Sequence, residues 1–230
     1  MDKPTKFKFG YYLVVGILAA STSLLLFGWL AEEMLDADTA HFDAVVRTAI
    51  HQFASPPLTH TMEVFSFLGS VVFIVGLTLL AMGLFIYFHR PRAAALLAIT
   101  MTGAAILDEV LKYAFHRPRP VAFFGSSPAS YSFPSGHALG SMCFYGALAM
   151  ILSARLASRA ARVFLYLGAI LLVSAIGISR IYLGVHYPSD VIAGYLAAIV
   201  WVGAVGVAQD FIRRRGANGP ERLGSASKSS

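Results

Sequence analysis

The chain has 230 residues, of which 57% are hydrophobic and only 13% are charged, whereas soluble domains average about 25% charged residues. This composition excludes a string of soluble domains and indicates a polytopic membrane protein with one compact bundle. The net charge is +6, but the basic residues lie at the ends of apolar segments, which fits membrane topology better than nucleic-acid binding. The single cysteine, Cys143, excludes a disulfide framework within the chain.

Several apolar segments approach or exceed the ~20 residues that a helix needs to cross a bilayer. We predict six spans, over residues 10–31, 62–88, 93–115, 136–155, 161–181 and 188–212. The sequence therefore predicts an all-α fold, with six transmembrane helices in one bundle formed by residues 1–213. The Gly- and Ser-rich segment 214–230 is expected to be a disordered cytoplasmic tail.

Between the first two predicted spans, residues 39–54 place apolar side chains at roughly helical spacing. These side chains are Phe42, Val45, Val46, Ala49, Ile50 and Phe53. The pattern has two interpretations: an amphipathic helix that lies on the membrane surface, or a helix packed over the mouth of the bundle. The dipeptide Pro56-Pro57 ends the segment.

The Lys and Arg residues are divided unequally between the two sides that six spans would define. Thirteen of the 18 lie on one side: Lys3, Lys6, Lys8, Arg90, Arg92, Arg155, Arg159, Arg162, Arg213, Arg214, Arg215, Arg222 and Lys228. The other side holds Arg47, Lys112, Arg117, Arg119 and Arg180. The positive-inside rule then predicts that both termini lie in the cytoplasm of a multi-pass protein of the cell membrane.

Three short polar clusters interrupt the apolar pattern, and the predicted topology places all three on the outer face. Their sequences are KYAFHRPRP at Lys112–Pro120, PSGH at Pro134–His137 and SRIYLGVHYPSD at Ser179–Asp190. Ionisable groups are costly near a membrane, so a cluster of them indicates a functional site.

The second cluster opens a predicted helix, where free backbone N–H groups and the helix dipole attract anions. Gly136 lets the backbone approach a ligand closely, and Ser135 can either donate to a ligand oxygen or simply cap the helix. Arg119 and Arg180 can bind phosphate oxygens through two donors each, and Lys112 adds a point charge. The alternative for a single such cation is a side chain that snorkels to the membrane interface.

In the third cluster, Pro188 suits the first position of a helix, which places Asp190 in the first turn. A carboxylate there can accept a hydrogen bond from one nitrogen of His186 and leave the other nitrogen free to attack. This is the orienting role of the acid in a catalytic triad, with histidine as the nucleophile. Asp190 would also stabilise its own helix N-terminus, and both roles can hold together.

Taken in order, Lys-x6-Arg-Pro, Pro-Ser-Gly-His and Ser-Arg-x5-His-x3-Asp resemble the signature of the type 2 phosphatidic acid phosphatase superfamily. The resemblance implies metal-independent hydrolysis of a phosphate ester or pyrophosphate through a phosphohistidine, without a cofactor. It implies that His186 is the nucleophile, that Asp190 orients it and that His137 protonates the leaving group. It also implies a phosphate site made of Lys112, Arg119, Ser135, Gly136 and Arg180.

Two features of the first cluster stay open in the sequence. Arg117-Pro118 repeats the Arg-Pro step two residues early; the spacing from Lys112 favours Arg119, but Arg117 is a near competitor. Asp108 and Glu109 lie one turn before Lys112, and we expect at least one of them to pair with a cation. No cluster of His, Cys, Asp or Glu has metal-ligand spacing, so no metal site is predicted.

The sequence therefore predicts a lipid phosphatase that acts at the outer leaflet, with a lipid phosphate and the bilayer as its partners. Undecaprenyl pyrophosphate is the favoured substrate by analogy, and phosphatidylglycerophosphate and phosphatidic acid are the alternatives. A lipid transporter or flippase is the rival from another class, but a carrier needs a site nearer the membrane midplane. A soluble haloperoxidase has similar motifs, but six spans argue against it.

Overall fold

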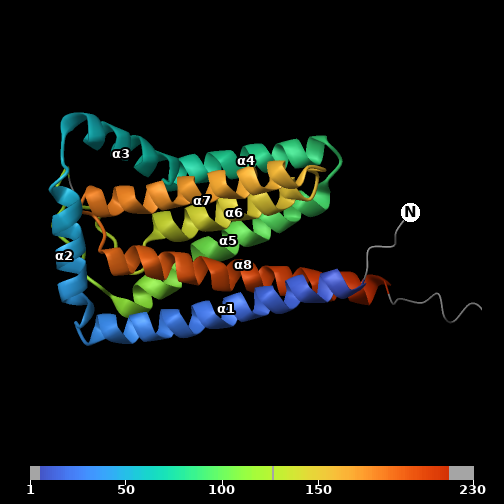
Figure 1. Cartoon of the computed structure of the whole chain (residues 1–230), viewed down its shortest axis with the longest axis horizontal. Helices are drawn as coiled ribbons and strands as arrows, with labels where there is room; N and C mark the ends of the chain where they lie inside the picture. The colour runs from blue at the N-terminus through green and yellow to red at the C-terminus, as the bar shows by residue number, and fades with distance from the viewer. Residues whose placement is uncertain (1–5, 126, 218–230) are drawn as a thin grey trace, which may run out of the picture.

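The computed structural model describes residues 6–125 and 127–217, and within them the chain forms helices and no strands. The helices are α1 (Lys6–Leu35), α2 (Thr39–His51), α3 (Pro56–Leu68), α4 (Val71–Tyr87), α5 (Pro91–Phe115), α6 (Gly136–Ser153), α7 (Arg159–Tyr182) and α8 (Pro188–Ala217). The long helices run side by side, and α2 lies across one end of the bundle (Figure 1). We call this end the α2 end. The predicted all-α membrane bundle is confirmed.

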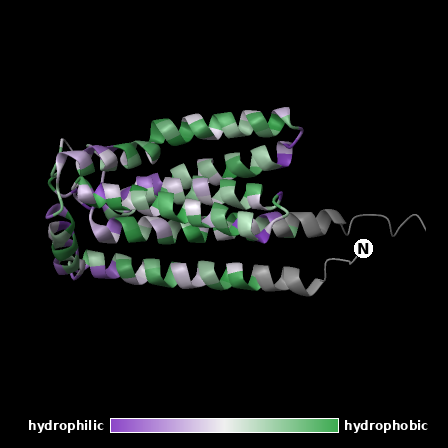
Figure 2. Cartoon of the chain, turned by 45° about the horizontal axis from the view of Figure 1, so that its top comes forward, coloured by the Kyte–Doolittle hydropathy of each residue, from purple (hydrophilic) through white to green (hydrophobic). Residues whose placement is uncertain are grey.

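Five of the described helices are each long and apolar enough to cross a membrane: α1 over Val14–Leu35, α5, α6, α7, and α8 over Pro188–Gln209. The pair α3 and α4 meets the same criterion jointly but is bent by 47°. If this pair counts as one span, the number agrees with the six predicted. Hydrophobic residues follow the lengths of these helices, whereas hydrophilic residues gather toward their ends (Figure 2).

The second predicted span, 62–88, is broken in the structure. The helical pair begins earlier, at Pro56, and is interrupted at Gly69 and Ser70. The Ser70 side chain accepts a hydrogen bond from the Phe73 backbone N–H at 3.3 Å and so caps the start of α4. A Cβ atom on Gly69 would lie 2.4 Å from Cγ2 of Ile176 on α7, so only glycine allows this approach.

Helix α6 lies inside the bundle and contacts α4, α5, α7 and α8. Its buried residues include Leu139, Cys143, Phe144 and Ala147, whereas the outer helices α1 and α4 expose many large apolar side chains. Apolar side chains on an outer surface are what a lipid environment requires. Helix α6 therefore carries its N-terminal motif into the centre of the α2 end.

Helix α2 presents its polar side to the bundle. Its residues Thr39 and Asp43 are buried on the side that faces the bundle, whereas its residues Phe42 and Val45 are exposed. This arrangement supports the second interpretation of residues 39–54, a helix packed over the mouth of the bundle, and the helix ends at His51. At the other end of the chain, α8 continues to Ala217 and so overlaps the start of the predicted tail 214–230. Residues 218–230 lie outside the described residues.

Candidate active site

All three sequence clusters meet at the α2 end. Helices α5 and α7 end there and helices α6 and α8 begin there, since α5, α6, α7 and α8 run in alternating directions (Figure 1). The segment 116–135 joins α5 to α6 across this end. It is held in place by backbone hydrogen bonds from Ser132 to Arg117 at 2.8 Å and from Phe123 to Leu183 at 3.1 Å. The eight predicted site residues therefore lie within one end of the bundle.

His186 and Asp190 lie as the sequence predicted, one before α8 and one in its first turn. Nδ1 of His186 is 3.4 Å from Oδ2 of Asp190. The same carboxylate oxygen accepts hydrogen bonds from the Tyr187 backbone N–H at 2.9 Å and from the Ser132 hydroxyl. Both side chains are buried, with 2% and 0% of their surface exposed.

The other nitrogen of His186 faces Arg119. Nη1 of Arg119 lies 2.9 Å from Nε2 of His186, and a guanidinium can only donate. Nε2 must therefore carry the lone pair, and the Nδ1 proton faces Asp190. Burial lowers the pKa of His186 to about 4, against the opposing effect of Asp190, so the ring is neutral near pH 7. The geometry thus presents an uncharged histidine with an oriented lone pair.

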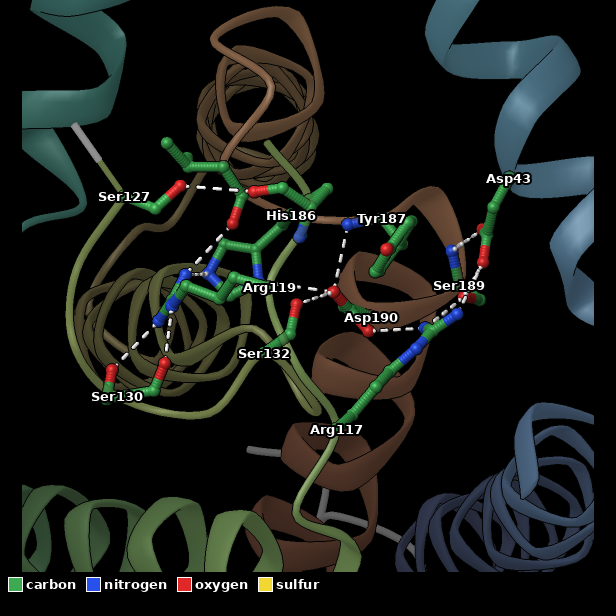
Figure 3. Close-up of polar contacts among 12 residues, drawn as sticks. Asp43, Arg117, Arg119, Ser127, Ser130, Ser132, His186, Tyr187, Ser189 and Asp190 are labelled. Carbon is green, nitrogen blue, oxygen red and sulfur yellow. Dashed lines mark hydrogen bonds and ion pairs between the residues drawn. The ribbon is translucent and has the colours of Figure 1, made fainter. Parts of the chain in front are cut away.

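Arg119 is itself fixed by the segment around it. Nε donates to the Ser130 carbonyl at 2.7 Å, Nη2 to the Ser130 hydroxyl at 2.9 Å and Nη1 to the Val185 carbonyl at 2.9 Å. Burial lowers the pKa of Arg119, whereas Asp190 and Asp108 raise it. Figure 3 shows its guanidinium beside His186. The spacing argument that favoured Arg119 over Arg117 agrees with this position.

Arg117 points to a different place. Its Nη1 donates to Oδ1 of Asp190 at 2.6 Å and to the Ser189 hydroxyl at 2.8 Å. Its Nη2 donates to Oδ2 of Asp43 on α2 at 2.8 Å (Figure 3). Sequence reasoning missed Asp43, Ser132 and Ser189 at this site. Asp43 lies within the predicted helical segment 39–54, where nothing in the sequence linked it to the three clusters, and the two serines carried no distinguishing signal.

The remaining predicted phosphate ligands surround the N-terminus of α6. Lys112 Nζ lies 2.5 Å from Oδ2 of Asp108, so Asp108 is the acid that pairs with this cation. A Cβ atom on Gly136 would lie 2.8 Å from the same oxygen, so this ion pair lies against the turn that opens α6. The Ser135 backbone N–H donates to the Asp190 carbonyl at 3.0 Å.

Several buried polar atoms at this end have no hydrogen-bond partner among the described residues. They include Oγ of Ser135, Nε of Arg180 and Oδ1 of Asp108. Nη1 of Arg180 donates to the Ser66 hydroxyl on α3. Buried donors rarely stay unpaired, so the Ser135 hydroxyl and the Arg180 Nε–H are two donors that an anionic ligand at this end can accept hydrogen bonds from.

His137 occupies the second position of α6, within this group of cations. The charged side chains that act on its ring are the cations Arg180, Arg119 and Lys112. A Cβ atom on Gly69 would lie 3.3 Å from Cδ2 of His137, so the break between α3 and α4 forms one wall beside the ring. Across residues 6–125 and 127–217, no three His, Cys, Asp or Glu side chains are grouped to hold a metal ion.

The family model of the PAP2 superfamily matches residues 93–213. Phosphatidylglycerophosphatase B of Bacillus subtilis is 31% identical over 157 residues, which cover 66% of this chain and 76% of the relative. An undecaprenyl-diphosphatase of Sulfolobus acidocaldarius is 33% identical over 131 residues, which cover 54% of this chain and 59% of that relative.

The fold agrees with these matches. A crystal structure of a transmembrane PAP2 type phosphatidylglycerolphosphate phosphatase from Bacillus subtilis superimposes with a TM-score of 0.77 and 27% identity, covering 85% of this chain and 98% of the other. The family match includes the clusters at Lys112–Pro120, Pro134–His137 and Ser179–Asp190. The chain therefore belongs to the PAP2 superfamily, as one of its multi-span membrane lipid phosphatases.

Proposed function

We propose that the chain removes a phosphate from a lipid phosphomonoester or pyrophosphate through a phosphohistidine on His186, without a metal ion. The single observation that carries this proposal is the arrangement of His186, whose Nδ1 faces Asp190 and whose Nε2 faces Arg119 at 2.9 Å. A neutral imidazole with a fixed tautomer is an activated nucleophile. Its lone pair already points toward the cation that would bind the substrate phosphate.

In the first step, Nε2 of His186 forms a bond to phosphorus while the bond from phosphorus to the leaving oxygen breaks. Arg119 moves from Nε2 to a phosphate oxygen, and Lys112 and Arg180 bind the other oxygens. The negative charge of the substrate offsets the cations around His137, so that ring can hold the proton that it delivers to the leaving oxygen. General acid catalysis of this kind typically contributes about 10²–10⁴-fold.

In the second step, neutral His137 takes a proton from a water molecule whose oxygen attacks the phosphorus. The N–P bond breaks, its electron pair returns to His186, and inorganic phosphate leaves. Three fixed cations neutralise the charge that develops on the phosphate oxygens, which is the role that a metal ion plays in other phosphatases.

We place this chemistry at the outer leaflet of the cell membrane. The support is the excess of Lys and Arg at the end of the bundle opposite the α2 end, including Arg92 at the start of α5 and Arg159 at the start of α7. A lateral approach suits a lipid, because its tails leave the bilayer only at a cost of about 0.8 kcal/mol per CH₂. A site at one end of the bundle also favours an enzyme over a transporter, which needs a site near the midplane.

We favour undecaprenyl pyrophosphate as the substrate, since an outward-facing site suits the recycling of a carrier lipid and one relative is named for this activity. Phosphatidylglycerophosphate is the second candidate, because the relative with the longer match and the solved structure are named for it. Phosphatidic acid is the third member of the panel to be tested.

The test is phosphate release by the purified protein in detergent from each of these three lipids, with EDTA present. We expect at least one lipid to be hydrolysed in EDTA, and vanadate to inhibit by occupying the phosphate site as a pentacoordinate mimic. His186→Ala should abolish turnover. Loss of activity in EDTA that one divalent ion restores would contradict the metal-independent mechanism, and no release from any lipid would contradict the reaction itself.

A further inference from the structure

Helix α2 lies outside residues 93–213, the part of the chain that the family model matches, yet one of its side chains is buried in the site. Asp43 is 1% exposed. Its Oδ1 accepts from the Ser189 backbone N–H at 2.9 Å, and its Oδ2 accepts from the Ser189 hydroxyl at 2.7 Å. Ser189 directly precedes Asp190, so α2 is fastened to the first turn of α8.

Arg117 links Asp43 to Asp190. Its two terminal nitrogens reach two carboxylates at once, Asp190 Oδ1 at 2.6 Å and Asp43 Oδ2 at 2.8 Å. Its guanidinium carbon also lies 4.1 Å from the centre of the Tyr187 ring. The result is a row of alternating charges, Asp43, Arg117 and Asp190, that ends at His186 (Figure 3).

These contacts fix the orientation of the Asp190 carboxylate. Its Oδ1 is occupied by Arg117, which leaves Oδ2 to face the His186 ring, the Ser132 hydroxyl and the Tyr187 N–H. At 3.4 Å the contact with His186 is the longest of the four, so the histidine alone does not fix the carboxylate. A buried carboxylate that loses its cation is strongly destabilised and reorients or takes up a proton.

We propose that Asp43 and Arg117 are positioning residues that hold the Asp190 carboxylate against His186. Helix α2 then contributes to catalysis through Asp43. This inference rests on the proposed function of His186. Arg117 would act on the rate of phosphoryl transfer, whereas Arg119 binds the phosphate. The competing explanation is that the row only fastens α2 to the bundle.

Arg117→Gln and Asp43→Asn test the proposal in the lipid phosphatase assay. Loss of an outer partner that orients a metal-binding side chain typically costs about 10–100-fold, and we take the same range for the partner that orients Asp190. We expect kcat to fall by that factor in Arg117→Gln, while KM and the vanadate inhibition constant stay within about threefold, the pattern of a lost transition-state interaction. Millimolar guanidinium should restore part of kcat in Arg117→Gln. In the double variant, kcat should be no lower than in Arg117→Gln alone, because the two side chains act through one contact.

Two control variants distinguish a role in positioning the Asp190 carboxylate from a role in attaching α2 to the bundle. Arg47 also ties α2 to the bundle, through the carbonyls of Val121 and Gly184, but it makes no hydrogen bond to Asp190. Arg47→Gln should lower thermal stability while the folded protein keeps its kcat. Asp38→Asn changes an exposed acid that caps no backbone N–H and should alter neither property.

Three results would overturn the inference. One is a raised KM with unchanged kcat in Arg117→Gln, which would make Arg117 a phosphate ligand. Another is a kcat loss in Arg47→Gln equal to that in Arg117→Gln, which would show fastening alone. The third is full activity in Arg117→Gln while His186→Ala is inactive, which would leave the proposed function standing. Turnover by His186→Ala would contradict the proposed function itself.

Discussion

The protonation state of His186 governs the chemistry at the residue scale. Its ring is buried between Asp190 and Arg119, and burial is the largest effect on its pKa, which falls from 6.5 to about 4. A protonated ring has no lone pair at Nε2 and cannot attack. The nucleophile is therefore available throughout the neutral range and is lost only as the pH falls through about 4.

This assignment predicts an NMR titration of the substrate-free protein. The His186 ring carbon, identified by subtracting the spectrum of a His186→Gln variant, should show no protonation between about pH 8 and 5. Since the folded pKa is below the unfolded value, the ring's contribution to stability is complete above about pH 6.5 and declines as the pH falls toward 4. A midpoint near 6.5 in the folded protein would contradict the buried, neutral ring.

Gly136 offers a second prediction, because a Cβ atom there would lie 2.8 Å from Oδ2 of Asp108. Gly136→Ala should displace the Asp108–Lys112 pair and weaken both turnover and vanadate inhibition by at least about tenfold, a loss of 1.4 kcal/mol or more. Gly140→Ala is the matched control one turn later, where a Cβ atom meets nothing within 4 Å. Equal losses in both variants would count against the site at the start of α6.

At the residue scale, the spacing of residues along the sequence predicted the positions of Arg119 and Asp190. The interval from Lys112 selects Arg119, and Pro188 places Asp190 in the first turn of α8. The partners of Asp190 could not be predicted, because Asp43 and Ser132 reach it from distant segments and neither has a local pattern. The position of Arg117 between Asp190 and Asp43 depends on how α2 packs against α8.

At the scale of elements, the apolar pattern predicted the five long helices but not the break between α3 and α4. The run 62–88 is mostly apolar, and the bend arises where Gly69 meets Ile176 of α7. The sequence also did not predict which side of α2 faces the bundle. Its apolar residues suggest a membrane-facing or core-facing surface, whereas the buried side is the one that carries Asp43.

The close approach of α5 and α8 gives a prediction about stability. A Cβ atom on Gly103 would lie 1.8 Å from Cζ2 of Trp201, whose indole N–H donates to the Thr100 carbonyl at 2.9 Å. Gly103→Ala should therefore destabilise the bundle by about 1–3 kcal/mol, the usual cost of overpacking. Thermal unfolding in detergent measures this. Gly83→Ala, at a position with open space on α4, should show no such loss, and equal melting temperatures would refute the α5–α8 contact.

At the scale of the whole molecule, topology is the main prediction. Ser127 lies in the segment at the α2 end and Ser158 caps the start of α7 at the opposite end; both are exposed. On a Cys143→Ala background, a cysteine at position 127 should be labelled by an impermeant thiol reagent added to intact cells. A cysteine at position 158 should be labelled only after lysis. The reverse pattern would move the site to the cytoplasmic side and exclude an outer-leaflet substrate.

The bundle as a whole was predictable because each long apolar segment must satisfy its backbone within a helix when it crosses lipid. Alternating helix directions then bring the three clusters to one end, whatever the details of packing. The choice of lipid is a different matter. It depends on the walls around the site, formed by α2 and the segment 116–135. The segment 116–135 has no helical or strand period to interpret, and the helical spacing of α2 does not indicate which lipid its side chains would contact.

The proposed mechanism depends above all on the transfer of phosphate to His186. The most direct measurement is to quench the protein during turnover of a ³²P-labelled lipid and map the label by mass spectrometry under alkaline conditions, in which phosphohistidine survives. We expect a phosphoryl group on His186 that, once formed, persists longer in His137→Ala, where water attack is slowed, and that is absent in His186→Gln. A label on another residue, or turnover with no covalent phosphate in His137→Ala, would contradict the proposed mechanism.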